Sequence, residues 1–299
     1  MNFDYGNTLM RAWQITWRNK VLWLIMTLPV LLSFLAFFPF FIFPVFVLNG
    51  DTSETTINIL GILAISFFFI FFIAAMAFHV IATSSATLGV IRAERGEGSM
   101  NFMDLLRGGF PYFGRSLGAF LIIQLGIGLI FTVFFMLVFL LSIVTMGIAT
   151  ICLQPIMLLL SPLMYLVIAV MEAAQTAIIA ENLGAVEAVK RAIEVVREHV
   201  WKYVIITLII YFGATILMSF IIFPIMLPAF FFPFLIGSGS EISTQALTLI
   251  FIGFMCLFFP LMALFSGLLQ AFMKSALNLT YLQLTQPGEE APVFIEANA

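Results

Sequence analysis

Long apolar segments recur along the chain and are separated by short polar ones. Six of them are long enough to cross a membrane as helices, at about residues 21–48, 57–91, 116–146, 150–180, 201–236 and 246–284. A helix needs roughly 20 mainly apolar residues to cross the hydrocarbon core of a bilayer. The pattern therefore predicts an all-α integral membrane protein with about six transmembrane helices.

The positive charges are restricted to alternate connections. Every Lys and Arg lies before the first apolar segment, between the second and third, between the fourth segment and the first residues of the fifth, or near the end of the sixth. The other three connections carry only the acidic residues Asp51, Glu54 and Glu241. Because cationic loops stay in the cytoplasm, we predict that both termini are cytoplasmic.

The cationic segments are amphipathic. The pattern predicts amphipathic helices at residues 4–20 and 185–203. A weaker amphipathic pattern at 101–115 is interrupted by Gly108, Gly109 and Pro111. Such helices lie in the membrane interface, where Trp is also favoured. In 185–203 the predicted apolar face consists of Val186, Val189, Ile193, Val196 and Val200. The predicted interfacial residues are Arg11, Trp13, Trp17, Arg18, Lys190, Arg191, Arg197 and Trp201.

The order of the segments suggests an internal repeat. Each unit has an amphipathic helix, an outgoing helix and a returning helix, which divides one membrane domain (1–286) into 1–98, 99–182 and 183–286. Aligning the third unit with the first places Arg191 on Arg11 and Tyr203 on Trp23. Any six-helix protein with both termini inside also forms three hairpins, so that alternative stays open. Residues 287–299 are predicted to be a polar cytoplasmic tail.

Small residues recur at four-residue spacing on the returning helices. Such faces allow neighbouring helices to approach closely, and we predict that the second, fourth and sixth helices pack together. The small residues are Ala82, Ala86, Ser85 and Gly89; Ala169, Ala173 and Ala177; and Ala263, Gly267, Ala271 and Ser275.

A polar cluster is predicted beside these faces. Its members are His79, Ser84, Ser85, Glu172, Gln175, Lys274 and Asn278. Glu172 lies about 13 Å deeper than Glu181 at ~1.5 Å per helical residue, so an unpaired charge there is costly. Lys274 takes the matching place in its repeat and is the expected partner. The cluster is either a structural ion pair, with His79 hydrogen-bonded inside the bundle, or a cytoplasm-facing cavity for a head group, an ion or a small polar solute.

Composition agrees with a membrane location and narrows the function. The chain is 63% hydrophobic and 9% charged, against about 45–50% and 25% in soluble domains. Its formal net charge of −3 gives no basic surface for nucleic acid. The sequence has no Walker, HExxH or GxSxG motif and only two histidines, so no catalysis, metal or cofactor is expected. Cys152 and Cys256 lie inside apolar segments and are expected to be buried.

One segment resembles a known family. Residues 185–206, AVEAVKRAIEVVREHVWKYVII, lead directly into an apolar run, and the opening NTLMRAWQITWRNKVLWLI is similar. Both resemble the membrane domain of some prokaryotic glycerophosphodiester phosphodiesterases and its uncharacterised stand-alone relatives. The resemblance implies a polytopic fold in a prokaryotic inner membrane. It implies no reaction, because that membrane domain has no agreed activity.

Three functions remain from the sequence. The leading hypothesis is a non-enzymatic membrane protein that organises membrane lipids or a partner protein at the cytoplasmic interface, with self-association through the small-residue faces also open. The alternative is a transporter or permease subunit with a polar site around Glu172 and Lys274. The third, a membrane-embedded lipid enzyme, lacks acid–base groups.

Overall fold

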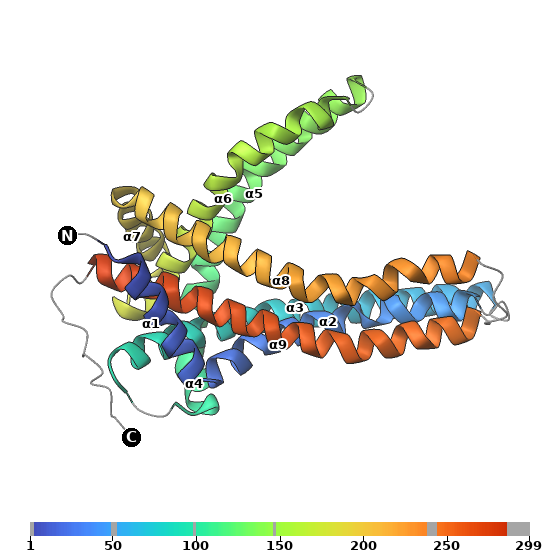
Figure 1. The fold of residues 1–299 in the computed structure, drawn as a ribbon, viewed down its shortest axis with the longest axis horizontal. Coiled ribbons are helices and arrows are strands. Elements are labelled where there is room, and N and C mark those ends of the chain that lie inside the picture. The colour runs from blue at the N-terminus through green and yellow to red at the C-terminus, as the bar shows by residue number, and fades with distance from the viewer. Residues whose placement is uncertain (1–2, 49–52, 98–99, 146–147, 238–243, 286–299) are drawn as a thin grey trace. The chain divides into compact units, whose positions relative to one another are not determined.

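The computed structural model describes residues 3–48, 53–97, 100–145, 148–237 and 244–285, and the regular structure within them is helical (Figure 1). Five helices are long and apolar enough to cross a membrane, or six if Tyr5–Arg18 and Val21–Phe37 form one bent span. The predicted all-α membrane class is confirmed. The predicted tail, Asp51 and Glu241 lie outside the described residues.

In the described residues, a short helical segment precedes each pair of long helices. The short elements are α1 (Tyr5–Arg18), α4 (Phe102–Gly109), the 3-10 helix η1 (Phe110–Tyr112) and α7 (Ala185–Glu198). The long helices are α2 (Val21–Leu48), α3 (Glu54–Glu94), α5 (Phe113–Val144), α6 (Ile148–Ala180), α8 (Val200–Gly237) and α9 (Thr244–Thr285). Each long helix covers most or all of one apolar segment identified in the sequence.

Local backbone chemistry sets several of these boundaries. α4 ends at Gly109, and Pro111 lies in the first turn of η1, where its missing N–H is tolerated. Gly96 and Asn182 adopt the left-handed conformation just after α3 and α6, with φ of 76° and 55°. Such residues commonly end helices.

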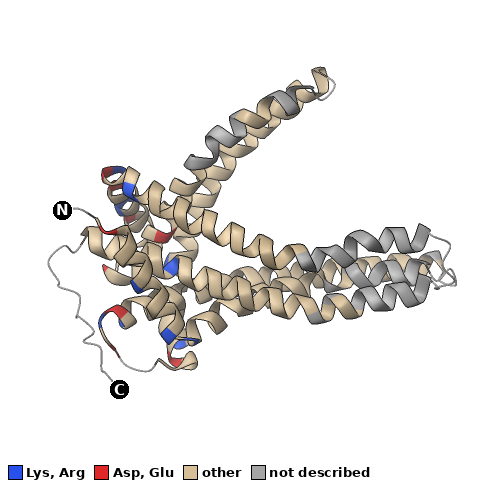
Figure 2. Cartoon of the chain, in the orientation of Figure 1, with Lys and Arg blue, Asp and Glu red and all other residues tan. Residues whose placement is uncertain are grey.

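The chain divides into two compact units. Unit 1 consists of Met1–Arg18, Ser84–Tyr211 and Phe272–Ala299, and unit 2 consists of Asn19–Thr83 and Phe212–Ala271. Every Lys and Arg except Lys20 belongs to unit 1, and Figure 2 shows the described charges gathered on its elements. Unit 1 therefore contains all but one of the Lys and Arg residues, and it also contains the candidate site.

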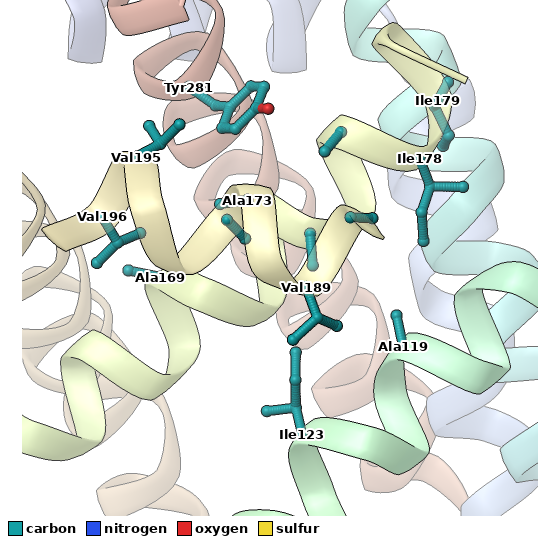
Figure 3. Close-up of a cluster of buried hydrophobic side chains, with 14 of the residues drawn as sticks. Ala119, Ile123, Ala169, Ala173, Ile178, Ile179, Val189, Val195, Val196 and Tyr281 are labelled. Atoms are coloured by element: carbon teal, nitrogen blue, oxygen red, sulfur yellow. The ribbon is translucent and has the colours of Figure 1, made fainter. Parts of the chain in front are cut away.

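The apolar core of unit 1 lies where α7 packs on α5 and α6. Figure 3 shows Val189 near Ile123, and Val195 and Val196 on the α7 segment beside α6. Ala188 and Ala192 are fully buried and allow this close packing. The predicted interfacial face of α7 is therefore partly wrong, because its valines at 189 and 196 are buried in the core. Val186 and Ile193 remain exposed.

The amphipathic helices α1 and α4 pack against small-residue faces of the returning helices. A Cβ on Gly109 of α4 would lie 2.8 Å from the backbone N and 2.9 Å from the Cα of Ser85 on α3. Thr16 of α1 donates a hydrogen bond to Ser275 of α9, with an O···O distance of 3.2 Å. The prediction that Ser85 and Ser275 face other returning helices is thus wrong. α6 and α9 do contact each other, as predicted, through the bonds described below.

These contacts follow a cyclic order. α4 packs on α3 and α7 packs on α6, so each contacts the returning helix that precedes it in the chain. α1 contacts α9, the last returning helix, through Thr16 and through Trp13 against Phe272. A threefold repeat would produce this order, although the repeat itself stays a prediction.

Unit 2 is an apolar bundle joined by glycine and aromatic contacts. Gly267 of α9 lies against the backbone of Thr27 on α2, and Phe34 stacks on Phe259 with ring centroids 3.8 Å apart. His79, expected inside the bundle, is exposed instead. It follows Phe72 and Met76 on the exposed side of α3, because residues spaced by three or four share a helix face.

The cysteine expectation is also wrong where the structure tests it. Cys256 is exposed on α9. Cys behaves as a small apolar side chain, so this position suits a lipid-facing surface. The surroundings of Cys152 lie outside the described side chains.

Candidate polar site in unit 1

The expected ion pair between Glu172 and Lys274 is present. Lys274 Nζ donates to Glu172 Oε2 at 2.6 Å and to Gln175 Oε1 at 2.7 Å. Lys274 is only 3% exposed, and the side chain of Glu172 is 19% exposed. A buried ammonium is tolerated only when it is paired and hydrogen-bonded. The two α6 acceptors provide this for the α9 lysine.

A second link between α6 and α9 lies one turn further along. Thr176 Oγ1 is 2.8 Å from the Glu172 carbonyl oxygen and 2.8 Å from Asn278 Oδ1. A hydroxyl has one hydrogen, so it donates to only one of these acceptors at a time. Asn278 is fully buried, and its Nδ2 has no hydrogen-bond partner. As placed, this amide therefore keeps one buried donor group unpaired.

α8 contributes a third wall. Tyr211 interacts electrostatically with Glu172, and its ring centroid lies 5.9 Å from that of Tyr165 on α6. Tyr203 and Thr207 precede Tyr211 at four-residue spacing, so the three share one face of α8. Tyr203 and Thr207 are buried, and neither of their hydroxyl groups has a hydrogen-bond partner.

A separate polar group ties α7 and α9 to the end of α6. Tyr281 OH donates to Glu181 Oε1 at 2.6 Å, and Arg191 Nε lies 3.5 Å from Glu181 Oε2. Burial by itself lowers the pKa of the Arg191 guanidinium, but the negative charge of Glu181 and neighbouring groups raises the pKa above its usual value. Arg191 therefore remains charged and holds α7 against α6.

Other predicted residues join different contacts. Ser84 donates to Ser116 of α5 at 2.9 Å, and Ser85 faces Gly109. Arg11 of α1 pairs with Glu94 at 2.8 Å. Of the predicted cluster, the structure brings together Glu172, Gln175 and Lys274, with Asn278 one turn away. His79 belongs to unit 2.

Thr176 was recognised in the sequence as a polar residue beside Glu172, but four residues on the α6 and α8 walls were missed. They are Tyr165, Tyr203, Thr207 and Tyr211. The four-residue spacing of the α8 residues could have identified them, since polar side chains recurring on one face of a transmembrane helix indicate an inward orientation.

Most of the predicted interfacial residues are exposed on unit 1, whereas Arg11 and Arg191 are held in ion pairs. The large apolar side chains exposed on the same elements are Met10, Trp13, Trp17, Met103, Phe110, Val186, Ile193 and Trp201. The exposed cations on these elements are Arg18, Arg107, Lys190 and Arg197. Trp13 and Trp17 stack with ring centroids 5.3 Å apart. We call this set the interfacial surface.

Comparisons with protein-family models, with curated proteins and with solved structures give no match to this chain. Among the described residues, no group of three or more His, Cys, Asp and Glu side chains could hold a metal ion. The fold and composition define the class, a multi-pass, all-helical membrane protein. Its function follows only from the surfaces and the polar site described above.

Proposed function

We propose that this protein is a non-catalytic membrane protein that gathers anionic lipids at its interfacial helices. One observation carries the proposal. α1, α4 with η1, α7 and the start of α8 are packed on one side, yet all keep large apolar side chains exposed on the other, up to 76% for Trp201. Exposed apolar side chains rimmed by polar ones are typical of surfaces that bind a membrane or another protein.

The chemistry of the interfacial surface fits a head-group region. Trp and long apolar side chains favour that depth. Exposed Arg and Lys beside them each gain about 1 kcal/mol near an anionic membrane surface. Glu187, Glu194 and Glu198 are also exposed on α7, so the attraction should be moderate. A partner protein could also use this surface, and it is the outcome to be distinguished.

Lipid enrichment tests the proposal. Protein reconstituted in vesicles of mixed anionic and zwitterionic lipid, then extracted into nanodiscs with a thin lipid shell, should retain anionic lipid above its share in the vesicles. Replacing Arg18, Arg107 and Arg197 together with Gln should remove the enrichment. The matched control replaces Arg92, Arg115 and Lys202, which are partly buried, and should keep more of it. No enrichment in the parent protein would refute lipid gathering.

The proposal also includes an orientation. On the positive charges we place both termini and the interfacial surface in the cytoplasm, and on the resemblance of 185–206 we place the chain in a prokaryotic inner membrane. In a background without natural cysteines, Ser53→Cys should react with an impermeant maleimide on intact cells. Glu97→Cys should react only after permeabilisation. Labelling of Glu97→Cys on intact cells would reverse or reject this topology.

A further inference from the structure

The polar site in unit 1 has more hydrogen-bonding capacity than the protein uses. Asn278 Nδ2 and Thr207 Oγ1 are both buried without a hydrogen-bond partner. The structure gives Lys274 Nζ two acceptors for its three N–H groups. Leaving a buried polar group unpaired costs about 1–3 kcal/mol. A site with several such groups is poorly explained by packing alone.

The site also has an accessible side. Glu172 keeps 19% of its side chain exposed, and Tyr165 and Tyr211 beside it are both half-buried. Lys274 and Asn278, by contrast, lie deep between α6 and α9. A partly exposed carboxylate and an aromatic pair thus lie beside buried amide, hydroxyl and ammonium groups. Binding sites for small molecules commonly combine apolar walls with a few such polar groups.

The charges indicate what kind of molecule would fit. Glu172 and Lys274 neutralise each other at 2.6 Å, so the site offers no net charge to an ion. The groups with spare capacity are a neutral amide, a neutral hydroxyl and one N–H of an already paired ammonium. We propose that unit 1 holds a binding site for a small polar molecule of no net charge, lined by Glu172, Lys274, Asn278, Thr207 and Tyr211.

This inference goes beyond lipid gathering and does not depend on it. The lipid surface consists of exposed groups on α1, α4, η1, α7 and α8, whereas this site lies between α6, α8 and α9. A failed lipid-enrichment experiment would not count against this binding site. A failed test of the binding site would not count against lipid gathering.

Cysteine reactivity in the full-length protein tests the site. In a Cys152→Ala, Cys256→Ala background, Asn278→Cys should react with neutral methyl methanethiosulfonate several times faster than Leu277→Cys. Leu277 is the matched control, since it is adjacent on α9 and almost fully buried. Anionic and cationic methanethiosulfonates of similar size should modify Asn278→Cys more slowly than the neutral reagent.

A second pair covers the case in which Asn278→Cys does not fold. Thr207→Cys should show the same preference over Ile206→Cys, since both parent residues are fully buried on α8. Equal rates within each pair would overturn the proposal, whether both positions react or neither does. Equal reaction with charged and neutral reagents would also overturn it, because an open ionic path would then replace a site selective for uncharged molecules.

Discussion

Replacing Glu172 with Gln, with Lys274 left in place, should destabilise unit 1 by about 3 kcal/mol, within the range for breaking a buried ion pair. Lys274 is 3% exposed, and among the described residues its other acceptor is Gln175 Oε1. The single change strands an ammonium below the membrane surface. Lys274→Met strands the carboxylate instead, at smaller cost because Glu172 is partly exposed.

A double variant of Glu172 and Lys274 distinguishes a structural ion pair from charges that belong to a binding site. Glu172→Gln with Lys274→Met should cost less than the sum of the single changes, giving a coupling energy of about 1–3 kcal/mol in a double-mutant cycle. Reversible unfolding in mixed detergent micelles measures it. Strictly additive costs would mean that the contact contributes nothing. A double variant that regains stability but loses the fast thiol reaction at Asn278→Cys would assign the charges to the binding site rather than to packing.

Gly109→Ala should cost about 1–3 kcal/mol, the usual range for overpacking a tight contact. The added Cβ would lie 2.8 Å from the backbone N and 2.9 Å from the Cα of Ser85. Backbone atoms cannot move away as a flexible side chain can, so α4 must separate from α3. Gly267→Ala should have a similar effect in unit 2, where the Cβ would meet the N of Thr27 at 2.8 Å.

Gly126→Ala is the matched control for both variants. Gly126 lies inside the long helix α5, as Gly267 lies inside α9, but a Cβ there would meet nothing within 4 Å. Its stability should stay the same or rise slightly, because Ala favours helix more than Gly does. Unfolding midpoints of the three variants in the same detergent provide the comparison. If Gly109→Ala and Gly126→Ala behaved alike, the close approach of α4 to α3 would be wrong.

The sequence predicted the helices better than their contacts. Apolar run length gave six long helices whose limits agree closely, because membrane insertion depends on local composition. The break at Gly108–Pro111 was also visible, since Pro cannot continue a helix. The partners of the small-residue faces were predicted incorrectly. Four-residue spacing shows that Ser85 and Ser275 lie on a smooth face, but not which helix approaches it.

The polar site was predictable only in part. Glu172 and Lys274 were paired correctly, because a deep charge needs a partner and the repeat alignment suggested one. His79 was placed wrongly, since a single polar residue shows no periodicity of its own and its neighbours Phe72 and Met76 are exposed. Tyr203, Thr207 and Tyr211 were overlooked because tyrosine and threonine are unremarkable in a membrane helix until their spacing is considered.

Trp201 offers the most direct test of the interfacial surface. In a protein with Trp13, Trp17 and Trp23 replaced by Phe, Trp201 is the sole remaining tryptophan and is 76% exposed. Its fluorescence would be measured in bilayers containing brominated lipids. We predict stronger quenching by bromine near the head group than near the chain end, and stronger quenching by brominated anionic than by brominated zwitterionic lipid at equal fraction. Equal quenching by the two lipid classes would contradict the gathering of anionic lipid by this surface.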